Sequence, residues 1–372
     1  MKLRRFWGIY IATAIHWLNA CLLFAVVTAF ISVGFFVLDK LRARGAESFY
    51  NARAVHSLGA DDAKKVFREF RRIGTTENSR PWIGFSEPPW HSQWVNIDTA
   101  EPVPVRRTPP PARGSFDRQS VIWLFGGSTA MGYGLPDDQT LAAHLQAFLQ
   151  HTFPATRVVV VNHGHLGHFS SQEVTLFQWL LRSGRHADVA IFLDGINDAS
   201  YTLDKPDIDF DGTIIKLSQP WMTFSVSFPP VRLFHAIRKR MVHESRANEI
   251  PSGEQLERHV TTVQQRYLAN VKLAESAGDA FGTATLFVWQ PSSFDSMRGR
   301  TKGAELQGFE KPMRMVNARL RGGIDDRRFL FLADIFANDK FLDTYIDTAH
   351  YGDAGTRKLA SAIAQRITLE GR

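Results

Sequence analysis

Cysteine is almost absent from this chain of 372 residues, which contains a single one, Cys21. One cysteine cannot form a disulfide within the chain, so a fold held together by disulfides is excluded and the redox compartment stays open. Zinc-finger spacing, recognition-helix signatures and long basic runs with interleaved aromatic residues are also missing. No nucleic-acid partner is therefore expected, although the net charge of +7 and the pI of about 9.6 suit an anionic surface or an acidic polymer.

Charged side chains are absent from residues 6–38, near the N-terminus. A bilayer core of about 30 Å needs about 20 apolar residues, and residues 17–38 are long enough by themselves. The run is too long for the apolar part of an ordinary signal peptide, and no A-x-A cleavage site follows it. Residues 1–44 are therefore predicted to form a short N-terminal tip and one transmembrane anchor. Lysines and arginines flank both ends, so charge alone does not orient the anchor.

Residues 45–119 form a stalk or accessory region with a different composition. A short helix is predicted at 61–72, where apolar residues share one side. Residues 81–94 are rich in tryptophan and proline, and the Thr-Pro-Pro-Pro run at 108–111 indicates a stiff linker or a turn. We expect this region to pack on the main domain.

From residue 120 onward, apolar runs with strand character alternate with helical patterns. Alternation of this kind predicts a parallel sheet with helices on both faces. The sequence thus predicts an α/β fold for residues 120–372: a flavodoxin-like, three-layer α/β/α domain with a five-stranded, mostly parallel sheet. The predicted strands are 121–125, 157–161, 189–193, 284–289 and 329–333, and the predicted helices are 138–153, 171–181, 256–277 and about 354–367.

An insertion at residues 199–255 interrupts this pattern and has no clear period. Its segment 228–240, FPPVRLFHAIRKR, is predicted to be a short basic amphipathic helix. That helix is either a solvated element packing one apolar face, or a lid, polymer-binding arm or membrane-surface helix. The insertion follows the third strand, at the edge where open α/β sheets bind ligands.

Four short segments carry the residue types of acyl-transfer chemistry. In the segment 347–350, Asp347 precedes His350 by three residues, so a turn can put carboxylate and imidazole side by side and leave one ring nitrogen free to take a proton. The other three segments each follow a predicted strand. They are Gly126-Gly127-Ser128, the N-x-G-x-x-G run from Asn162 to Gly167, and Gly195-Ile196-Asn197-Asp198.

Together these segments resemble the four sequence blocks of the SGNH (GDSL-like) hydrolase family, over roughly residues 120–368. The resemblance implies a Ser-His-Asp triad of Ser128, His350 and Asp347. It also implies an oxyanion hole formed by Ser128, Gly167 and Asn197. A glycine lets its N–H point at the oxyanion, and an asparagine supplies a side-chain donor, each such donor contributing about 3 kcal/mol to transition-state stabilisation.

One residue departs from the family pattern, because Gly127 stands where the first block usually has aspartate. That aspartate is not the nucleophile, so the chemistry of the motif is retained. Ser128 considered alone is more often a turn or helix-capping residue. A phosphate loop is disfavoured because the Lys-Ser/Thr ending is missing, and the G-x-S-x-G elbow lacks its final glycine.

Further residues near these blocks are predicted to line the substrate pocket, namely His163, His165, Trp289 and Gln290. Three histidines around Gly167 also raise a metal hypothesis. Loop residues need not converge on one point, and the family uses no metal. We therefore expect neither a metal site nor a cofactor.

The GGST form of the first block, the SSQE segment at 170–173 and the FLDGIND block resemble the membrane-anchored bacterial branch of the family, many members of which act near exported polysaccharides. The resemblance implies a single-pass inner-membrane protein with its catalytic domain facing the periplasm. The expected function is an esterase that removes acyl groups, above all acetyl groups, from a carbohydrate polymer or similar ester. Polysaccharide-export proteins are candidate partners.

Two alternatives remain open at the level of sequence. An O-acyltransferase would use the same triad, with a sugar hydroxyl replacing water. A non-catalytic binding subunit of a polysaccharide synthesis or export complex would keep only the fold. The presence of all five expected site residues argues against the second alternative, because binding alone does not require Asp347 beside His350.

Overall fold

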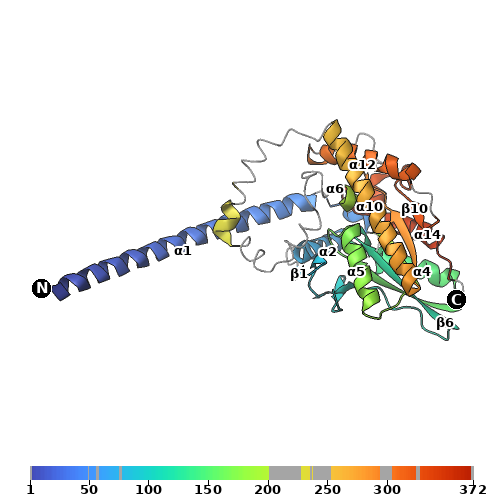
Figure 1. Ribbon diagram of the computed structural model, residues 1–372, viewed down its shortest axis with the longest axis horizontal. Helices are drawn as coiled ribbons and strands as arrows, with labels where there is room; N and C mark the ends of the chain where they lie inside the picture. The colour runs from blue at the N-terminus through green and yellow to red at the C-terminus, as the bar shows by residue number, and fades with distance from the viewer. Residues whose placement is uncertain are drawn as a thin grey trace. The chain divides into compact units, whose positions relative to one another are not determined.

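The structure is a computed structural model that describes residues 2–48, 50–55, 58–74, 78–200, 228–234, 237, 253–293, 304–323 and 327–369. Most of the insertion predicted at 199–255, including the aromatic segment up to residue 227, lies outside the described residues. The chain divides into two compact units (Figure 1). The first comprises Met1–Ser48 with Pro220–Glu249, and the second Phe49–Gln219 with Ile250–Arg372.

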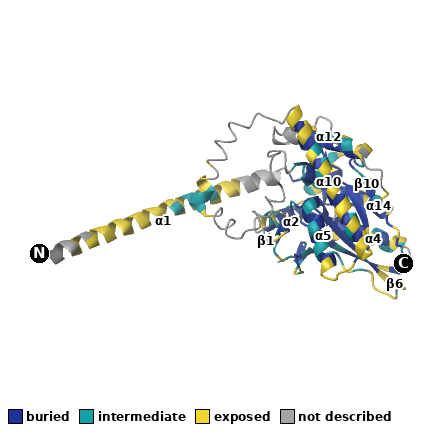
Figure 2. Cartoon of the chain, in the orientation of Figure 1, coloured by how far each residue is buried: buried dark blue, intermediate teal, exposed yellow. Residues whose placement is uncertain are grey.

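The first unit contains α1 (Lys2–Ser48), a single helix of 47 residues. Its stretch Tyr10–Leu41 has a mean hydropathy of 2.7, and no part of the most apolar window is buried. Figure 2 shows the helix exposed along most of its described length. The prediction of one long apolar N-terminal helix is confirmed, and by length and composition this helix can cross a membrane.

A second element of this unit is helical over residues 229–234, within the segment predicted to form a basic amphipathic helix. Arg232 forms an ion pair with Asp39 of α1 at 2.8 Å and lies over the Phe35 ring, 4.3 Å from its centroid. Phe228 lies near Phe24, with ring centroids 6.3 Å apart. Phe228 and Arg232 of the insertion thus contact α1.

The second unit is built on an eight-stranded sheet in the order β10-β9-β8-β6-β7-β5-β4-β3. Five adjacent strands, from β10 at one edge to β7, all pair in parallel. They are β6 (Arg118–Gly126), β7 (Thr156–Gly164), β8 (Val189–Asp194), β9 (Ala284–Trp289) and β10 (Phe329–Phe331). All five coincide with predicted strands. Across the sheet they lie in the order β7-β6-β8-β9-β10, so the first of them along the chain lies between the second and the third, which is the flavodoxin-like order. The predicted α/β fold with a mostly parallel sheet is confirmed.

The predicted count of five strands is too low, because three short strands extend the sheet beyond β7. They are β3 (Trp90–His91), β4 (Asn96–Asp98) and β5 (Val105–Arg106), and each pairs antiparallel with its neighbour. Strands of two or three residues are too short to show an alternating pattern. A separate hairpin of β1 (Asn78–Arg80) and β2 (Gly84–Ser86) precedes them.

Helices cover both faces of the sheet (Figure 1). On one face lie α4 (Leu141–Thr152) and α14 (Asp353–Ala364), and on the other α5 (Ser170–Arg182), α10 (Glu254–Phe281) and α12 (Ala304–Gly323). Alternate residues of β6 divide between two cores: Trp123 and Phe125 face α5, whereas Ile122 and Leu124 face α4. Helix α12 was not predicted.

The remaining elements are short, apart from the predicted α2 (Ala60–Ile73). They are η1 (Ala52–Ala54), α3 (Ser128–Met131), η2 (Asp137–Gln139), α6 (Ile196–Ser200) and α13 (Phe341–Thr344).

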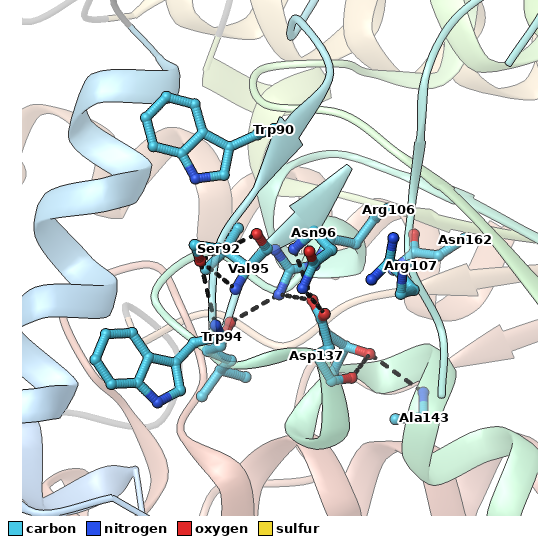
Figure 3. A network of polar contacts seen from close by, with 12 residues as sticks. Trp90, Ser92, Trp94, Val95, Asn96, Arg106, Arg107, Asp137, Ala143 and Asn162 are labelled. Atoms are coloured by element: carbon cyan, nitrogen blue, oxygen red, sulfur yellow. Dashed lines mark hydrogen bonds and ion pairs between the residues drawn. The ribbon is translucent and has the colours of Figure 1, made fainter. Parts of the chain in front are cut away.

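A buried polar network joins the accessory strands to the loop after α3 (Figure 3). The guanidinium of Arg106 is fully buried, pairs with Asp137 at 2.9 Å and donates to the Leu135 carbonyl at 3.0 Å. Asp137 also accepts from the Asn96 backbone N–H at 3.0 Å and from its amide at 2.7 Å. Burial lowers the pKa of Arg106 to about 10, although the charge of Asp137 opposes this. The accessory residues 49–119 therefore belong to the same compact unit as the α/β sheet.

Candidate active site

The predicted functional residues meet at one edge of the sheet. Ser128 follows the carboxyl end of β6, Gly167 follows that of β7, and Asn197 follows that of β8. Because parallel strands end at the same edge, the three loops are neighbours. His350 reaches this edge from the loop between α13 and α14.

Ser128, His350 and Asp347 form a continuous hydrogen-bonded chain. Nε2 of His350 lies 2.8 Å from the Ser128 hydroxyl oxygen. Nδ1 of the same ring lies 2.8 Å and 2.9 Å from the two carboxylate oxygens of Asp347. His350 and Asp347 are about four-fifths buried, with 17% and 21% of their side chains exposed. This arrangement can remove the serine proton and hold the resulting imidazolium.

Local backbone geometry fixes the Asp347 carboxylate. Burial by itself raises the pKa of Asp347, but the charge of His350 and its hydrogen bond outweigh burial. The backbone N–H groups of Ala349 and His350 add two further hydrogen bonds, each of 2.8 Å. The pKa of Asp347 consequently lies below its usual value, so the group is ionised near neutral pH.

The Tyr133 ring packs against the His350 ring, and the sequence did not predict this contact. The two ring centroids lie 4.4 Å apart, and the Tyr133 N–H donates to the Ser128 carbonyl at 2.9 Å. Burial, with the charge of Asp347, raises the pKa of Tyr133 to about 12. The phenol therefore stays neutral beside the imidazole.

Three N–H donors lie in the loops around Ser128. Ser128 is the first residue of α3, where a backbone N–H has no acceptor within the helix. Gly167 has φ +73°, and its N–H has no acceptor among the described residues. The Asn197 amide donates to the His168 carbonyl at 2.6 Å, which orients the amide and leaves its second hydrogen free for another acceptor.

The Gln290 side chain accepts hydrogen bonds from two segments of the candidate site. Its Oε1 accepts from the Thr129 hydroxyl at 2.7 Å and from the Tyr351 hydroxyl at 3.1 Å. Thr129 and Tyr351 are the residues directly after Ser128 and His350. Gln290 thus links the two segments that carry the serine and the histidine.

The structure corrects the prediction that His163, His165, Trp289 and Gln290 contact substrate. All four are buried, with exposed fractions of 4%, 1%, 0% and 2%. His163 stacks on Phe125 in the core at 5.2 Å, and burial lowers its pKa to about 3. The Trp289 indole donates to an asparagine of α12 at 2.6 Å. From sequence alone, neither an apolar run nor a histidine in a loop shows whether its side chain faces the core or the solvent.

A buried carboxyl cluster lies beneath the Asn197 loop. Asp198 accepts a hydrogen bond from the Ser170 hydroxyl at 2.5 Å. Burial raises the pKa of Glu173 and of Asp194 well above their usual values, and the negative charge of Asp198 adds to this. Among the described residues, no three His, Cys, Asp or Glu side chains are grouped to hold a metal ion.

No protein-family model matches this chain, and no curated protein matches it in sequence. Solved structures do match. A two-domain esterase active on acetylated mannans is 15% identical, with a TM-score of 0.36 over 67% of this chain and 49% of that one. A member of the lipolytic protein G-D-S-L family from Veillonella parvula is 12% identical, with a TM-score of 0.38 over 67% and 97%.

A variant of an acetyl-xylooligosaccharide esterase from Geobacillus is 14% identical, with a TM-score of 0.39 over 69% of this chain and 96% of that one. The present chain spans about half the length of the mannan esterase. Similarity of this degree concerns the fold alone.

Proposed function

We propose that this chain is a serine esterase of the SGNH type that removes acyl groups by way of a covalent acyl-enzyme. One observation carries the proposal: the Ser128 hydroxyl, the His350 imidazole and the Asp347 carboxylate are joined by hydrogen bonds of 2.8 Å. A serine of ordinary structural role needs no imidazole on its hydroxyl. An imidazole held by a carboxylate on its far nitrogen is the arrangement that activates a hydroxyl nucleophile.

The reaction proceeds in two displacements. Ser128 Oγ attacks the ester carbonyl carbon while His350 Nε2 takes the hydroxyl proton. The tetrahedral intermediate then expels the alcohol, to which His350 returns that proton. Water attacks the acyl-serine with His350 again as base, which releases the carboxylic acid and restores Ser128.

The oxyanion of each tetrahedral intermediate forms next to Ser128. Its expected donors are the backbone N–H groups of Ser128 and Gly167 and the side-chain amide of Asn197. Donors fixed before the reaction need no reorganisation when charge develops, and each contributes roughly 3 kcal/mol. Asp347 stabilises the imidazolium formed at the same moment.

The proposed substrate is an acetylated carbohydrate polymer or a similar ester, and the proposed location is the outer face of the inner membrane. The resemblance of the sequence blocks to the membrane-anchored bacterial branch supports both. The long apolar helix α1 supports anchoring. The proposed position of the hydrolase domain, residues 120–372, on the periplasmic side rests on the resemblance alone. The net charge of +7 suits an anionic polymer or membrane surface.

The proposal is tested with the full chain in detergent micelles. Wild type and Ser128→Ala are compared for release of p-nitrophenol from p-nitrophenyl acetate and of acetate from acetylated xylan. We expect turnover by wild type only. Addition of sugar acceptors then separates hydrolysis from transfer, because a transferase would produce acetylated sugar in place of acetate. Wild type without turnover on any ester would leave the binding-subunit alternative in its place.

Membrane orientation is tested separately, with reporters fused after residue 369. We expect an alkaline phosphatase fusion to be active and a cytoplasmic fluorescent reporter to be dark. The reverse pattern would place the hydrolase domain in the cytoplasm and contradict the proposed location.

A further inference from the structure

The loop that carries Gly167 is held by a segment far upstream, in the accessory region. The Ile83 carbonyl accepts from the Gln172 amide at 2.7 Å, and the Phe85 carbonyl lies 2.8 Å from Nε2 of His168. The Phe85 ring lies against Gly167, where an added Cβ would be 3.5 Å from its edge. These contacts hold the Gly167 loop and the first turn of α5 against residues 83–85.

Glu87 makes the strongest contacts of this segment. Its Oε1 accepts from the Leu166 backbone N–H at 2.5 Å, and its Oε2 lies 2.7 Å from Nδ1 of His165. Both side chains of the Glu87–His165 pair are only 1% exposed. One carboxylate therefore binds two consecutive residues immediately before Gly167.

This bridge acts directly on the direction of the Gly167 N–H. The peptide unit between Leu166 and Gly167 carries that N–H, and Glu87 fixes the preceding peptide unit through the Leu166 N–H. Gly167 itself adopts φ +73°, which only glycine populates readily, so its backbone would otherwise be free to move. An oxyanion donor is effective only when its direction is set before charge develops.

We propose that Glu87 is a positioning residue for the oxyanion hole, which holds the Gly167 N–H toward the Ser128 site through its bonds to Leu166 and His165. This inference rests on the proposed esterase function and deepens it. It makes the accessory region a part of the catalytic apparatus, although that region lies outside the four sequence blocks. Glu87 touches neither substrate nor the reacting atoms.

The test compares four variants of the full chain in detergent. Glu87→Gln keeps an acceptor for the Leu166 N–H and is expected to stay within about tenfold of wild-type kcat. Glu87→Ala removes the acceptor for the Leu166 N–H. Its kcat on p-nitrophenyl acetate should fall about 10²-fold with little change in KM, as for loss of one oxyanion donor.

Glu87→Ala leaves His165 buried without its partner and could lose activity simply because it misfolds. A third variant separates misfolding from loss of the positioning role. Glu87→Leu combined with His165→Phe replaces the whole pair by apolar groups of similar size, a change that folded proteins often tolerate. This double variant is expected to fold and still to lose about 10²-fold in kcat. A folded double variant with wild-type kcat would overturn the proposal.

Asp137→Asn is the matched control, because Asp137 also ties the accessory region to the main domain but does not touch the Gly167 loop. It should lower thermal stability and leave kcat per folded molecule unchanged. If Asp137→Asn lowers kcat as much as Glu87→Ala, Glu87 merely docks the accessory region and the proposal is wrong.

Hydrogen exchange of residues 164–169 gives a readout that needs no activity. Exchange should accelerate at least tenfold in Glu87→Ala and remain unchanged in Asp137→Asn. If wild type shows no esterase activity, the proposed function fails, and exchange alone then decides whether Glu87 holds the loop. Unchanged exchange in Glu87→Ala would reject the positioning role.

Discussion

Gly127 and Asn197 lie so close together that position 127 has no room for a side chain. A Cβ atom on Gly127 would lie 2.4 Å from Nδ2 of Asn197 and 2.9 Å from the His168 carbonyl oxygen. The Asn197 amide itself donates to that carbonyl at 2.6 Å. The glycine that departs from the Gly-Asp-Ser form is therefore required by the close packing of position 127 against Asn197 and His168.

This packing predicts that the family's usual aspartate at position 127 lowers esterase activity. Gly127→Asp must push the Asn197 amide away, so esterase kcat should fall at least about 10²-fold, the usual effect of losing one oxyanion donor. Steady-state kinetics and thermal unfolding check this. Gly59→Asp is the control, since a Cβ at Gly59 meets nothing within 4 Å and the residue caps α2, where aspartate is favourable. Full activity of Gly127→Asp would refute the steric account.

The contact between Asp347 and His350 predicts a large effect of a small change. Asp347→Asn keeps the shape but places an amide against Nδ1, which favours the wrong tautomer. The kcat for ester hydrolysis should fall about 10⁴-fold. Asp343→Asn, an exposed aspartate of α13 four residues earlier, serves as the control and should keep wild-type kcat. A loss below tenfold in Asp347→Asn would mean that the carboxylate does not orient the histidine.

The buried carboxyl cluster predicts an unusual dependence of stability on pH. Burial, with the charges of Asp194 and Asp198, raises the pKa of Glu173 well above its usual value. The folded state therefore binds more protons than the unfolded state above that value, so the free energy of unfolding falls as pH rises toward the raised pKa.

Glu173→Gln mimics the protonated acid and removes this titration. Thermal unfolding of both proteins from about pH 5 to about pH 8 should show a variant that gains stability relative to wild type as pH increases. Glu254→Gln, at an exposed glutamate in the first turn of α10, should follow wild type throughout. A constant difference between Glu173→Gln and wild type across this range would contradict the raised pKa.

The sequence predicts the central sheet well because each central strand is a run of apolar residues. Residues of β6 and β8 are buried on both faces, and this leaves continuous runs such as VIWLF and VAIFL. The loops after these strands carry the glycines and polar residues of the candidate site, so their approximate position also follows from sequence. The spacing of Asp347 and His350 predicts their contact, but Ser128 and His350 are 222 positions apart, and the sequence could propose their bond only through the family resemblance.

Other parts of the site depend on tertiary packing that no local pattern reveals. Glu87 meets His165 across 78 positions of chain, from a region without periodicity. Trp289 and Gln290 end an apolar strand, and sequence does not show that Trp289 faces the core while Gln290 bonds to Thr129. The position of the second-block histidines around Gly167 predicts that they line the pocket, whereas the fold buries them.

The central claim is that Ser128 is a nucleophile activated by His350. The most direct measurement is covalent labelling of the full chain with a fluorophosphonate, followed by peptide mass spectrometry. A single adduct on the peptide that contains Ser128, absent from Ser128→Ala and present in Ser276→Ala, is the predicted result; Ser276 is an exposed serine of α10. A folded wild type that remains unlabelled, or an adduct that persists in Ser128→Ala, would contradict the claim.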